Sequence, residues 1–281
     1  MNELKKELNW DIKQQPIFDG TEFIGTDLVK GHKSIRRDDN GLVLNVTNST
    51  YNPMTTARFK EKVSAITGIS DFKLVGFDEF NGGKIILAYL ENNVKDLNIG
   101  GNRIQDYIVI GTSFDNSKPF FVGTTSVLLR CTNQFSSIAK LVKVRNTKNS
   151  EDRIQEAQKY LESYVVNRSK MFKKFDDFSK VIIDPRVKEE MVEYMLGITE
   201  QDKLDDNVAT QKSNKKIILM DAVITETKAL GDNLWGLFNG ATYYTTHLVD
   251  QKHETFGNLF GTKASLNEKA FKFCEKKLLE V

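Results

Sequence analysis

The sequence predicts an α+β fold, with antiparallel β-hairpins and one helix in the N-terminal half and a helical C-terminal half. Three observations support this prediction. Turn sequences rich in asparagine and glycine separate short extended runs before residue 130. Apolar residues recur at helical spacing after residue 154. Only four prolines in 281 residues leave long stretches free to form regular structure. We expect a β-rich core over residues 1–150 and a helical region packing on it over 151–281.

The first predicted hairpin joins residues 28–37 to residues 42–51 through Asp38-Asp39-Asn40-Gly41. Asparagine and glycine both tolerate a positive φ, which a tight hairpin turn requires. Leu42, Leu44 and Val46 alternate with Val43, Asn45 and Thr47, as in a half-buried strand. The pattern therefore predicts that one face of this hairpin is buried.

A helix and two more hairpins are predicted next. Phe59, Val63 and Ile66 fall at helical spacing within residues 55–67, and Gly68 is placed to end the helix. The predicted hairpins pair residues 72–80 with 84–91, turning at 81–83, and residues 104–114 with 120–129, turning at 115–119. Residues 93–103 between them have the composition of a loop.

The C-terminal half is predicted to be mostly helical. A long apolar face runs from Ile154 to Phe178. The next predicted helix covers residues 187–196, between Asp184-Pro185 and Gly197, and another covers residues 217–230, after a polar stretch at 200–215 that is a loop or a helix start. Asp232 or Asn233 is predicted to cap the helix that follows. A terminal helix is predicted from the Ser265–Glu268 capping box.

Composition limits the classes of function. Charged residues make up 28% of the chain and the net charge is only +2, so an electrostatic binding site must come from a local cluster. Two cysteines provide no disulfide framework. No stretch approaches the roughly 20 apolar residues of a membrane span, and the first residues carry no apolar signal segment. We expect a cytoplasmic protein that does not contact membranes.

Recognisable catalytic chemistry is missing from the sequence. There is no phosphate-binding Gly-x-x-x-x-Gly-Lys-Ser/Thr loop and no Gly-x-Ser-x-Gly elbow. The three histidines have no metal-ligand spacing. Acidic pairs such as Asp176-Asp177 are adjacent in sequence, where side chains usually diverge. We therefore expect no enzyme activity, no catalytic residue, no metal site and no cofactor.

Two basic stretches are candidate sites for phosphate contact. In the run from Lys140 to Asn149, an extended strand places Lys143 and Arg145 on one face, and Arg130 and Asn133 lie just upstream. On the first hairpin, alternation puts Lys33 and Arg37 on one face and Arg36 on the other. The alternative interpretations are an edge strand protected by lysines and a solvated hairpin face.

The segment from Asn233 to Tyr244 is unusually rich in aromatic and small residues. Its aromatic side chains are candidates for stacking on bases if they are exposed. The alternative is a helix that packs closely on a neighbour through Gly236 and Gly240.

Several segments together resemble the phage/plasmid-like protein family of unknown function. They are Leu8-Asn9-Trp10-Asp11-Ile12, Asp39 to Val46 leading to Tyr51-Asn52-Pro53-Met54, Ser126 to Gln134, Val144 to Thr147, Trp235 to Asn239, and Phe260-Gly261-Thr262. In the family the middle motif is a strand that enters a helix start; here its order is Arg130-Cys131-Thr132-Asn133. The family's Trp-His-Gly segment is missing. This resemblance implies no catalytic residues.

The predicted order of helix, two hairpins and a helix after residue 131 is also similar to the Redβ/RecT-type annealing superfamily. This resemblance implies single-stranded DNA binding, annealing without ATP, and assembly into homo-oligomeric rings or filaments. The residues expected to contact DNA are Lys33, Arg36, Arg37, Arg130, Asn133, Lys140, Lys143, Arg145 and Lys148. The alternative is an interaction protein with a host or phage protein partner, such as an anti-restriction factor, a takeover factor or a virion-packaged protein.

Overall fold

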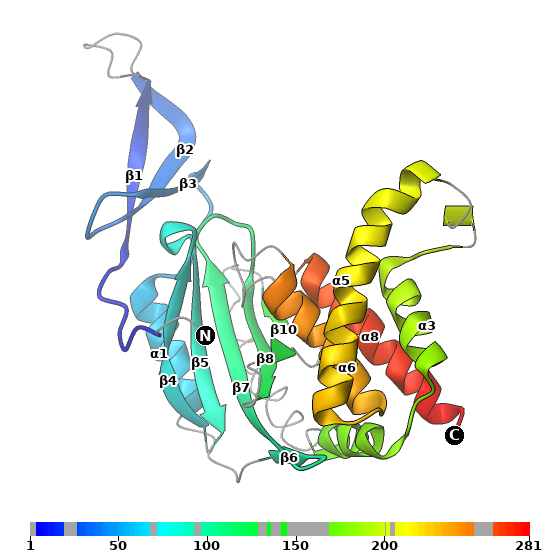
Figure 1. The fold of residues 1–281 in the computed structure, drawn as a ribbon. Helices are drawn as coiled ribbons and strands as arrows, with labels where there is room; N and C mark the ends of the chain where they lie inside the picture. The colour runs from blue at the N-terminus through cyan, green and yellow to red at the C-terminus, as the bar shows by residue number, and fades with distance from the viewer. Residues whose placement is uncertain are drawn as a thin grey trace. The chain divides into compact units, whose positions relative to one another are not determined.

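The computed structural model describes residues 4–19, 27–67, 72–92, 97–128, 134–135, 142–144, 169–199, 201–202, 206–249 and 261–281. Within these ranges, antiparallel strands form most of the N-terminal half and helices form the C-terminal half (Figure 1). The predicted α+β fold is therefore confirmed. No helix in the described ranges is both long enough and apolar enough to cross a membrane.

The chain divides into two compact units and passes between them more than once. Unit 1 comprises residues 1–94, 107–123 and 140–162, and unit 2 comprises residues 95–106, 124–139 and 163–281. Residues 95–106 and 124–139 therefore group with the C-terminal helices, although they precede residue 150.

Unit 1 contains a three-stranded antiparallel sheet in the order β1-β2-β3. Its strands are β1 (Ile12–Asp19), β2 (Asp27–Arg37) and β3 (Val43–Asn48). The predicted Asn40-Gly41 turn joins β2 to β3, with Gly41 at φ 72°. Strand β1 was not predicted, because Lys13, Gln14 and Gln15 hide any alternation of apolar residues.

The larger sheet has seven strands among the described residues, in the order β10-β8-β7-β5-β4, with β6 on β7 and β9 on β8. The bounds are β4 (Phe72–Phe80), β5 (Ile85–Asn92), β6 (Leu97–Ile99), β7 (Asn102–Ser113), β8 (Phe120–Leu128), β9 (Gln134–Phe135) and β10 (Val142–Val144). Both predicted hairpins are confirmed, and the first turns at Asn81–Gly83. Ile85 to Leu90 are all buried, as in a strand covered on both faces.

One prediction about this region is wrong. The segment expected to be a loop at residues 93–103 contains strand β6, which pairs with the start of β7 around Gly100-Gly101. Both glycines have positive φ, which permits this tight connection. The resemblance also implied a helix after residue 131; between that residue and residue 168 the structure describes only Gln134–Phe135 and Val142–Val144, and Gln134 and Phe135 form β9 against Val127 and Ser126.

Helix α1 (Thr56–Thr67) is where the sequence predicts it. Phe59, Val63 and Ile66 are at most 1% exposed, so the periodic apolar face is the buried face. The ring of Phe59 lies 6.4 Å from that of Phe77 in β4, measured between centroids. Gly68, the expected stop, lies outside the described residues.

Unit 2 contains a helical core. The described helices are residues 169–180, α3 (Pro185–Leu196), α5 (Asp206–Leu230), α6 (Leu234–Tyr243), the π-helix η2 (Tyr244–Leu248) and α8 (Thr262–Leu279). Gly197 ends α3 at φ 62°, as predicted, and the helix begins at Pro185, two residues before the predicted start, with the Asp184 side chain as its cap. Of the two predicted caps for α6, Asn233 is the one used, and its side chain accepts a hydrogen bond from the Gly236 amide.

Other helix boundaries differ from prediction. Helix α5 begins at Asp206, so it includes much of the stretch for which a loop or a helix start was expected. Helix α8 begins at Thr262, which places Ser265 and Glu268 inside the helix and makes the predicted capping box wrong. Of the predicted long helix after Ile154, only residues 169–180 are described.

The aromatic segment of α6 is buried. Trp235, Leu237 and Phe238 are at most 2% exposed, and the Phe175 ring lies 5.4 Å from Trp235 and 5.5 Å from Phe238. A Cβ on Gly240 would lie 2.5 Å from the Cα of Val223 in α5, so glycine permits the close approach of these two helices. The interpretation as a closely packed helix is therefore confirmed, and these aromatic residues are not available to stack on bases.

Candidate nucleic-acid interface

The predicted cationic residues that the structure describes lie on two strands. Lys33, Arg36 and Arg37 are in β2, the central strand of the three-stranded sheet. Lys143 is in β10, at one end of the larger sheet. The remaining predicted residues lie outside the described ranges: Arg130, Asn133, Lys140, Arg145 and Lys148.

The pairing register gives the three-stranded sheet two different faces. Directly opposite residues in an antiparallel pair point to the same face, and successive residues alternate. The side of the sheet that carries Arg37 and Ile35, which are 9% and 0% exposed, is called the inner face. The other side is called the outer face, and it is formed by two rows of directly opposed residues, Lys13–Arg36–Val43 and Gln15–Ser34–Val46.

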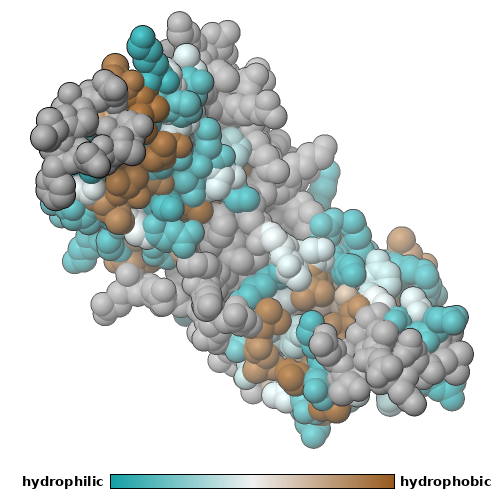
Figure 2. Space-filling model, turned by 90° about the horizontal axis from the view of Figure 1, so that it is seen from above, coloured by the Kyte–Doolittle hydropathy of each residue, from teal (hydrophilic) through white to brown (hydrophobic). Residues whose placement is uncertain are grey.

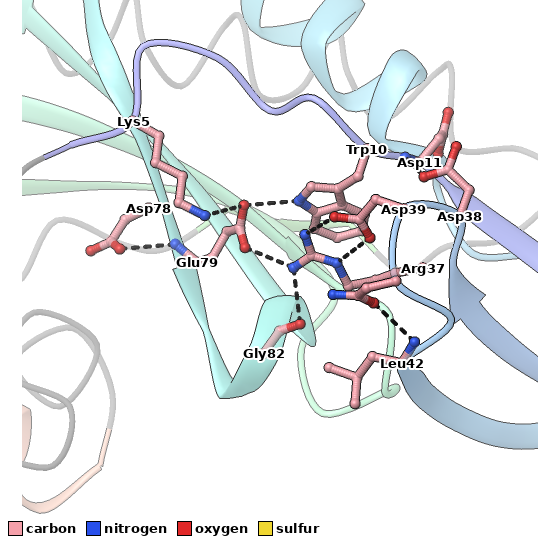
Figure 3. Close-up of polar contacts among 11 residues, drawn as sticks. Lys5, Trp10, Asp11, Arg37, Asp38, Asp39, Leu42, Asp78, Glu79 and Gly82 are labelled. Atoms are coloured by element: carbon pink, nitrogen blue, oxygen red, sulfur yellow. Dashed lines mark hydrogen bonds and ion pairs between the residues drawn. The ribbon is translucent and has the colours of Figure 1, made fainter.

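On the inner face, Arg37 is held by several groups of the protein (Figure 3). Its Nε and Nη2 donate to the two carboxylate oxygens of Asp39, at 2.9 and 2.6 Å. Its Nη1 donates to Glu79 Oε2 at 2.9 Å and to the carbonyl of Gly82 at 3.2 Å. The guanidinium carbon lies 4.1 Å from the centroid of the Trp10 ring. Arg37 thus has most of its donors satisfied inside the protein.

Glu79 is the second centre of this network. Besides Arg37, it accepts hydrogen bonds from Lys5 Nζ and Trp10 Nε1, both at 2.8 Å. Burial alone would raise the pKa of Glu79, but these three hydrogen bonds outweigh burial and the pKa lies below its ordinary value. The hydrogen bonds from Arg37 likewise lower the pKa of Asp39. Both carboxylates are therefore held ionised. We call Lys5, Trp10, Arg37, Asp39 and Glu79 the Arg37 network.

The Arg37 network is a structural anchor. It connects the end of β2 to strand β4 and to the turn between β4 and β5. Gly83, at φ 95°, lies directly beneath it: a Cβ there would lie 2.9 Å from both Arg37 Nη1 and Trp10 Cζ2. Since its guanidinium is enclosed in this way, Arg37 is a poor candidate for phosphate contact.

Asp11 and Asp38 are used structurally as well. The Asp11 carboxylate accepts hydrogen bonds from the amides of Thr56 and Ala57, so it caps the N-terminus of α1. Asp38 accepts a hydrogen bond from the Asp11 amide at 2.8 Å. The Trp10-Asp11 motif and Asp39, noted in the sequence for their resemblance to a family, thus have roles in holding the sheet to its neighbours.

The outer face presents cations without carboxylate partners among the described residues. Lys13 and Arg36 lie directly opposite each other and both are exposed. Arg36 Nε donates to Ser34 Oγ at 3.3 Å, and no described carboxylate forms an ion pair with either cation. Like charges directly opposite in a sheet are destabilising. An anion placed over the pair would relieve this repulsion.

Two further lysines of β2 differ in availability. Lys33 is half-buried, and its Nζ donates to the carbonyl of Ser49 at 2.8 Å. Lys30 is exposed and lies in an irregular part of β2 near the far end of the hairpin. Lys13 and Lys30 were not selected from the sequence as contact residues. Lys13 was missed because strand β1 itself was not recognised.

For the second predicted surface, the basic stretch around Lys143, the structure confirms the expected strand and nothing more. Residues 142–144 of β10 pair antiparallel with residues 120–122 of β8, and β10 ends the order of the larger sheet. The extended conformation expected around Lys143 is therefore present.

Metal and nucleophile chemistry has no support among the described residues. No group of three or more His, Cys, Asp or Glu side chains is placed to hold a metal ion within those ranges. Cys274 is fully buried, and burial raises the pKa of its thiol. Such a thiol is packed as a small apolar side chain.

Comparison with known proteins identifies a family. No curated protein and no solved structure is detectably similar to the chain. A family model described as "Domain of unknown function (DUF932)" matches residues 43–270, which include β3, α1, the larger sheet and most of the helical unit. The chain therefore belongs to the DUF932 family, a family of unknown function.

Proposed function

We propose that this protein binds single-stranded DNA along the outer face of the β1-β2-β3 sheet and anneals complementary strands without ATP, in phage or plasmid recombination. The observation that supports this most is the exposed pair Lys13 and Arg36, directly opposite each other. A folded protein that retains such a repulsive pair gains by placing an anion over it. A phosphate backbone supplies anions in a row, which matches a strand surface.

The second part of the proposed interface is strand β10 with Lys143, which ends the larger sheet among the described residues. The basic residues that surround it in sequence, Lys140, Arg145 and Lys148, belong to the same proposal, as do Arg130 and Asn133 upstream. The similarity to the Redβ/RecT-type superfamily supports annealing and a homo-oligomeric ring or filament in the cytoplasm. Annealing needs no nucleotide, since it only requires two strands to be held with their bases accessible.

The test is the binding of a fluorescent single-stranded oligonucleotide over a series of salt concentrations, with and without the complementary strand. We expect salt-sensitive binding and faster annealing. Lys13→Glu combined with Arg36→Glu should weaken binding and make the slope of log K against log salt shallower by about 1.4, the value for two lost phosphate contacts on a single strand. Lys143→Glu combined with Arg145→Glu tests the second part of the interface, at β10, in the same way.

A matched control separates this surface from net charge. Lys6→Glu combined with Lys73→Glu changes the charge of the protein by the same amount at two other exposed positions of unit 1. This control should retain the wild-type salt slope. If the wild-type protein does not bind at low salt, the proposal is refuted, and capture of a host or phage protein partner becomes the next experiment. Equal effects of the two charge-reversal pairs would refute the assignment to the outer face.

A further inference from the structure

We propose that His32 in β2 is a third phosphate contact on the outer face, and that its protonation makes the sheet bind single-stranded DNA more tightly at mildly acidic pH. This inference rests on the proposed function and specifies how binding at the same face responds to pH. Histidine is the side chain that ordinarily gains or loses its charge between about pH 5 and pH 8. A histidine in line with exposed cations therefore makes the number of phosphate contacts depend on pH.

The register places His32 on the outer face. His32 lies directly opposite Asn48, and the pairing of β2 with β3 has no shift from there to Ile35. Because successive strand residues alternate between faces, His32 shares the outer face with Ser34 and Arg36. Four residues of extended strand separate His32 from Arg36, a distance of roughly 13 Å. A nucleic-acid backbone carries phosphates at regular intervals, so one strand can contact both side chains.

His32 is accessible from solution. It is exposed, as are the two cations Lys13 and Arg36 of the same face. In Figure 2, hydrophilic residues lie beside hydrophobic ones at the surface, at the end where Figure 1 draws β1 to β3. Among the described residues, the His32 side chain contacts one backbone carbonyl and forms no ion pair. A phosphate can therefore approach its ring without displacing a carboxylate of the described protein.

The contact of the ring with Lys30 determines which nitrogen can bind a phosphate. His32 Nδ1 lies 3.4 Å from the carbonyl oxygen of Lys30. A carbonyl oxygen only accepts hydrogen bonds, so the proton of the neutral ring is on Nδ1 and Nε2 keeps a free lone pair. A proton taken up from solvent binds Nε2 and turns this nitrogen from an acceptor into a charged donor. A phosphate oxygen accepts a hydrogen bond from the charged ring, whereas the neutral Nε2 has none to donate.

The charges of the surrounding strands favour an anion at this position. The charged residues of the three strands are Lys13, Asp19, Asp27, Lys30, Lys33, Arg36 and Arg37. Strand β3 supplies none of them, and the two acidic residues, Asp19 and Asp27, pair with each other at the far end of the β1–β2 hairpin. Lys33 and Arg37 belong to the inner face and are bonded within the protein. A phosphate over the outer face stabilises the charged ring, so protonation of His32 and DNA binding favour each other.

The test measures the Kd of a fluorescent oligonucleotide made only of thymidines, whose bases stay neutral, at about pH 6 and about pH 8 over a series of salt concentrations. We expect the wild-type Kd to rise about two- to fivefold from the lower to the higher pH, the range for one exposed ion pair. The slope of log K against log salt should become shallower by about 0.7, the value for one lost phosphate contact on a single strand. His32→Gln should show neither change, and His32→Arg should keep the steeper slope at both pH values.

Two controls separate His32 from other effects of pH. His247→Gln removes a histidine of unit 2 and should keep the wild-type response to pH. Because His32 is exposed, thermal unfolding of His32→Gln and His32→Arg should match that of wild type, which shows that both variants are folded.

The outcomes distinguish this inference from the proposed function. If wild type binds equally at both pH values, or if His32→Gln keeps the wild-type change, the His32 contact is refuted while DNA binding stands. If His32→Arg binds no better than His32→Gln at the higher pH, a charge at this position does not contact DNA and the inference is overturned. If wild type binds the oligonucleotide at neither pH, both proposals fail.

Discussion

Adjacent arginines in β2 are expected to have opposite roles, and alanine substitution of each tests this. The side chains of Arg37 and Glu79 are 10% and 9% exposed, so their ion pair is largely buried. Removing one partner of a buried pair costs about 3–5 kcal/mol. We expect about 3 kcal/mol for Arg37→Ala, at the lower end, because Glu79 keeps Lys5 and Trp10 as donors. Arg36→Ala removes an exposed side chain and should change stability by less than about 0.5 kcal/mol.

Tryptophan fluorescence during urea unfolding measures the difference. The chain has two tryptophans, Trp10 in unit 1 and Trp235 in unit 2, so Trp235→Phe provides a background in which only unit 1 is observed. With a slope of about 2 kcal/mol per molar urea, a loss of about 3 kcal/mol lowers the midpoint by roughly 1.5 M. Arg37→Lys keeps the charge but loses the two-pronged contact with Asp39, so its midpoint should fall between those of wild type and Arg37→Ala.

The opposite roles of Arg36 and Arg37 are refuted if Arg36→Ala and Arg37→Ala shift the midpoint equally. The structural role of Arg37 is refuted if Arg37→Ala has no measurable effect, because the inner face would then not depend on the Arg37 network. A changed slope instead of a changed midpoint would indicate that the substitution alters the unfolded state or the compactness of the native state.

Three further predictions concern other parts of the fold. Gly240→Ala places a Cβ 2.5 Å from the Cα of Val223, so unit 2 should lose about 1–3 kcal/mol in urea unfolding followed by Trp235; an unchanged midpoint would contradict the close helix contact. Asn233→Ala removes the cap of α6 and should cost about 1 kcal/mol, whereas Asn233→Asp keeps the acceptor and most of the stability. Because the pKa of Glu79 lies below its ordinary value of 4.5, its ionised form stabilises unit 1 fully above that pH and loses this effect as the pH falls through the native pKa. In thermal melts, the stability of Glu79→Gln should therefore fall less in acid than that of wild type. Burial raises the pKa of Asp78, so protonation of Asp78 makes stability change with pH in the opposite direction, and this contribution is the same in both proteins.

Local signals in the sequence predicted most of the fold. Asn40-Gly41 and Asn81–Gly83 were recognised as turns because few residues adopt positive φ, and the structure has Gly41 at 72° and Gly82 at 71°. Gly197 ends α3 for the same reason. These signals depend only on the chemistry of a few adjacent residues, so they hold whatever the rest of the chain does.

The incorrect structural predictions concern sequence patterns that are compatible with two different local structures. Ser265 and Glu268 have the spacing of a capping box, but the same residues are also acceptable inside a helix, and α8 begins at Thr262 after Gly261 at φ 91°. Strand β6 has only three residues, too few for a periodic signal, and it is stabilised by its pairing with β7. In neither case does the local sequence pattern select one of the two structures.

The candidate site was predicted only in part for a related reason. Alternation along β2 correctly separated Arg36 from Lys33 and Arg37, because strand residues alternate between faces. Alternation does not say which face is buried. That depends on Glu79, which is 42 positions from Arg37 in sequence, and on Trp10, which is 69 positions from Glu79. No spacing rule connects residues that far apart.

If the outer face binds DNA as proposed, the two faces of β2 imply that substitutions on them weaken binding with different temperature dependences. Arg37 acts only by holding the sheet in place, so its loss lowers the apparent affinity in proportion to the fraction of molecules whose sheet is still attached. Well below the unfolding midpoint that fraction is close to one, and Arg37→Ala should then bind DNA almost as wild type does. Arg36 would act on the phosphate itself, so Arg36→Glu should weaken binding at every temperature. If the two substitutions weakened binding in parallel across temperature, Arg37 would contact DNA directly and the division of β2 into an inner and an outer face would be incorrect.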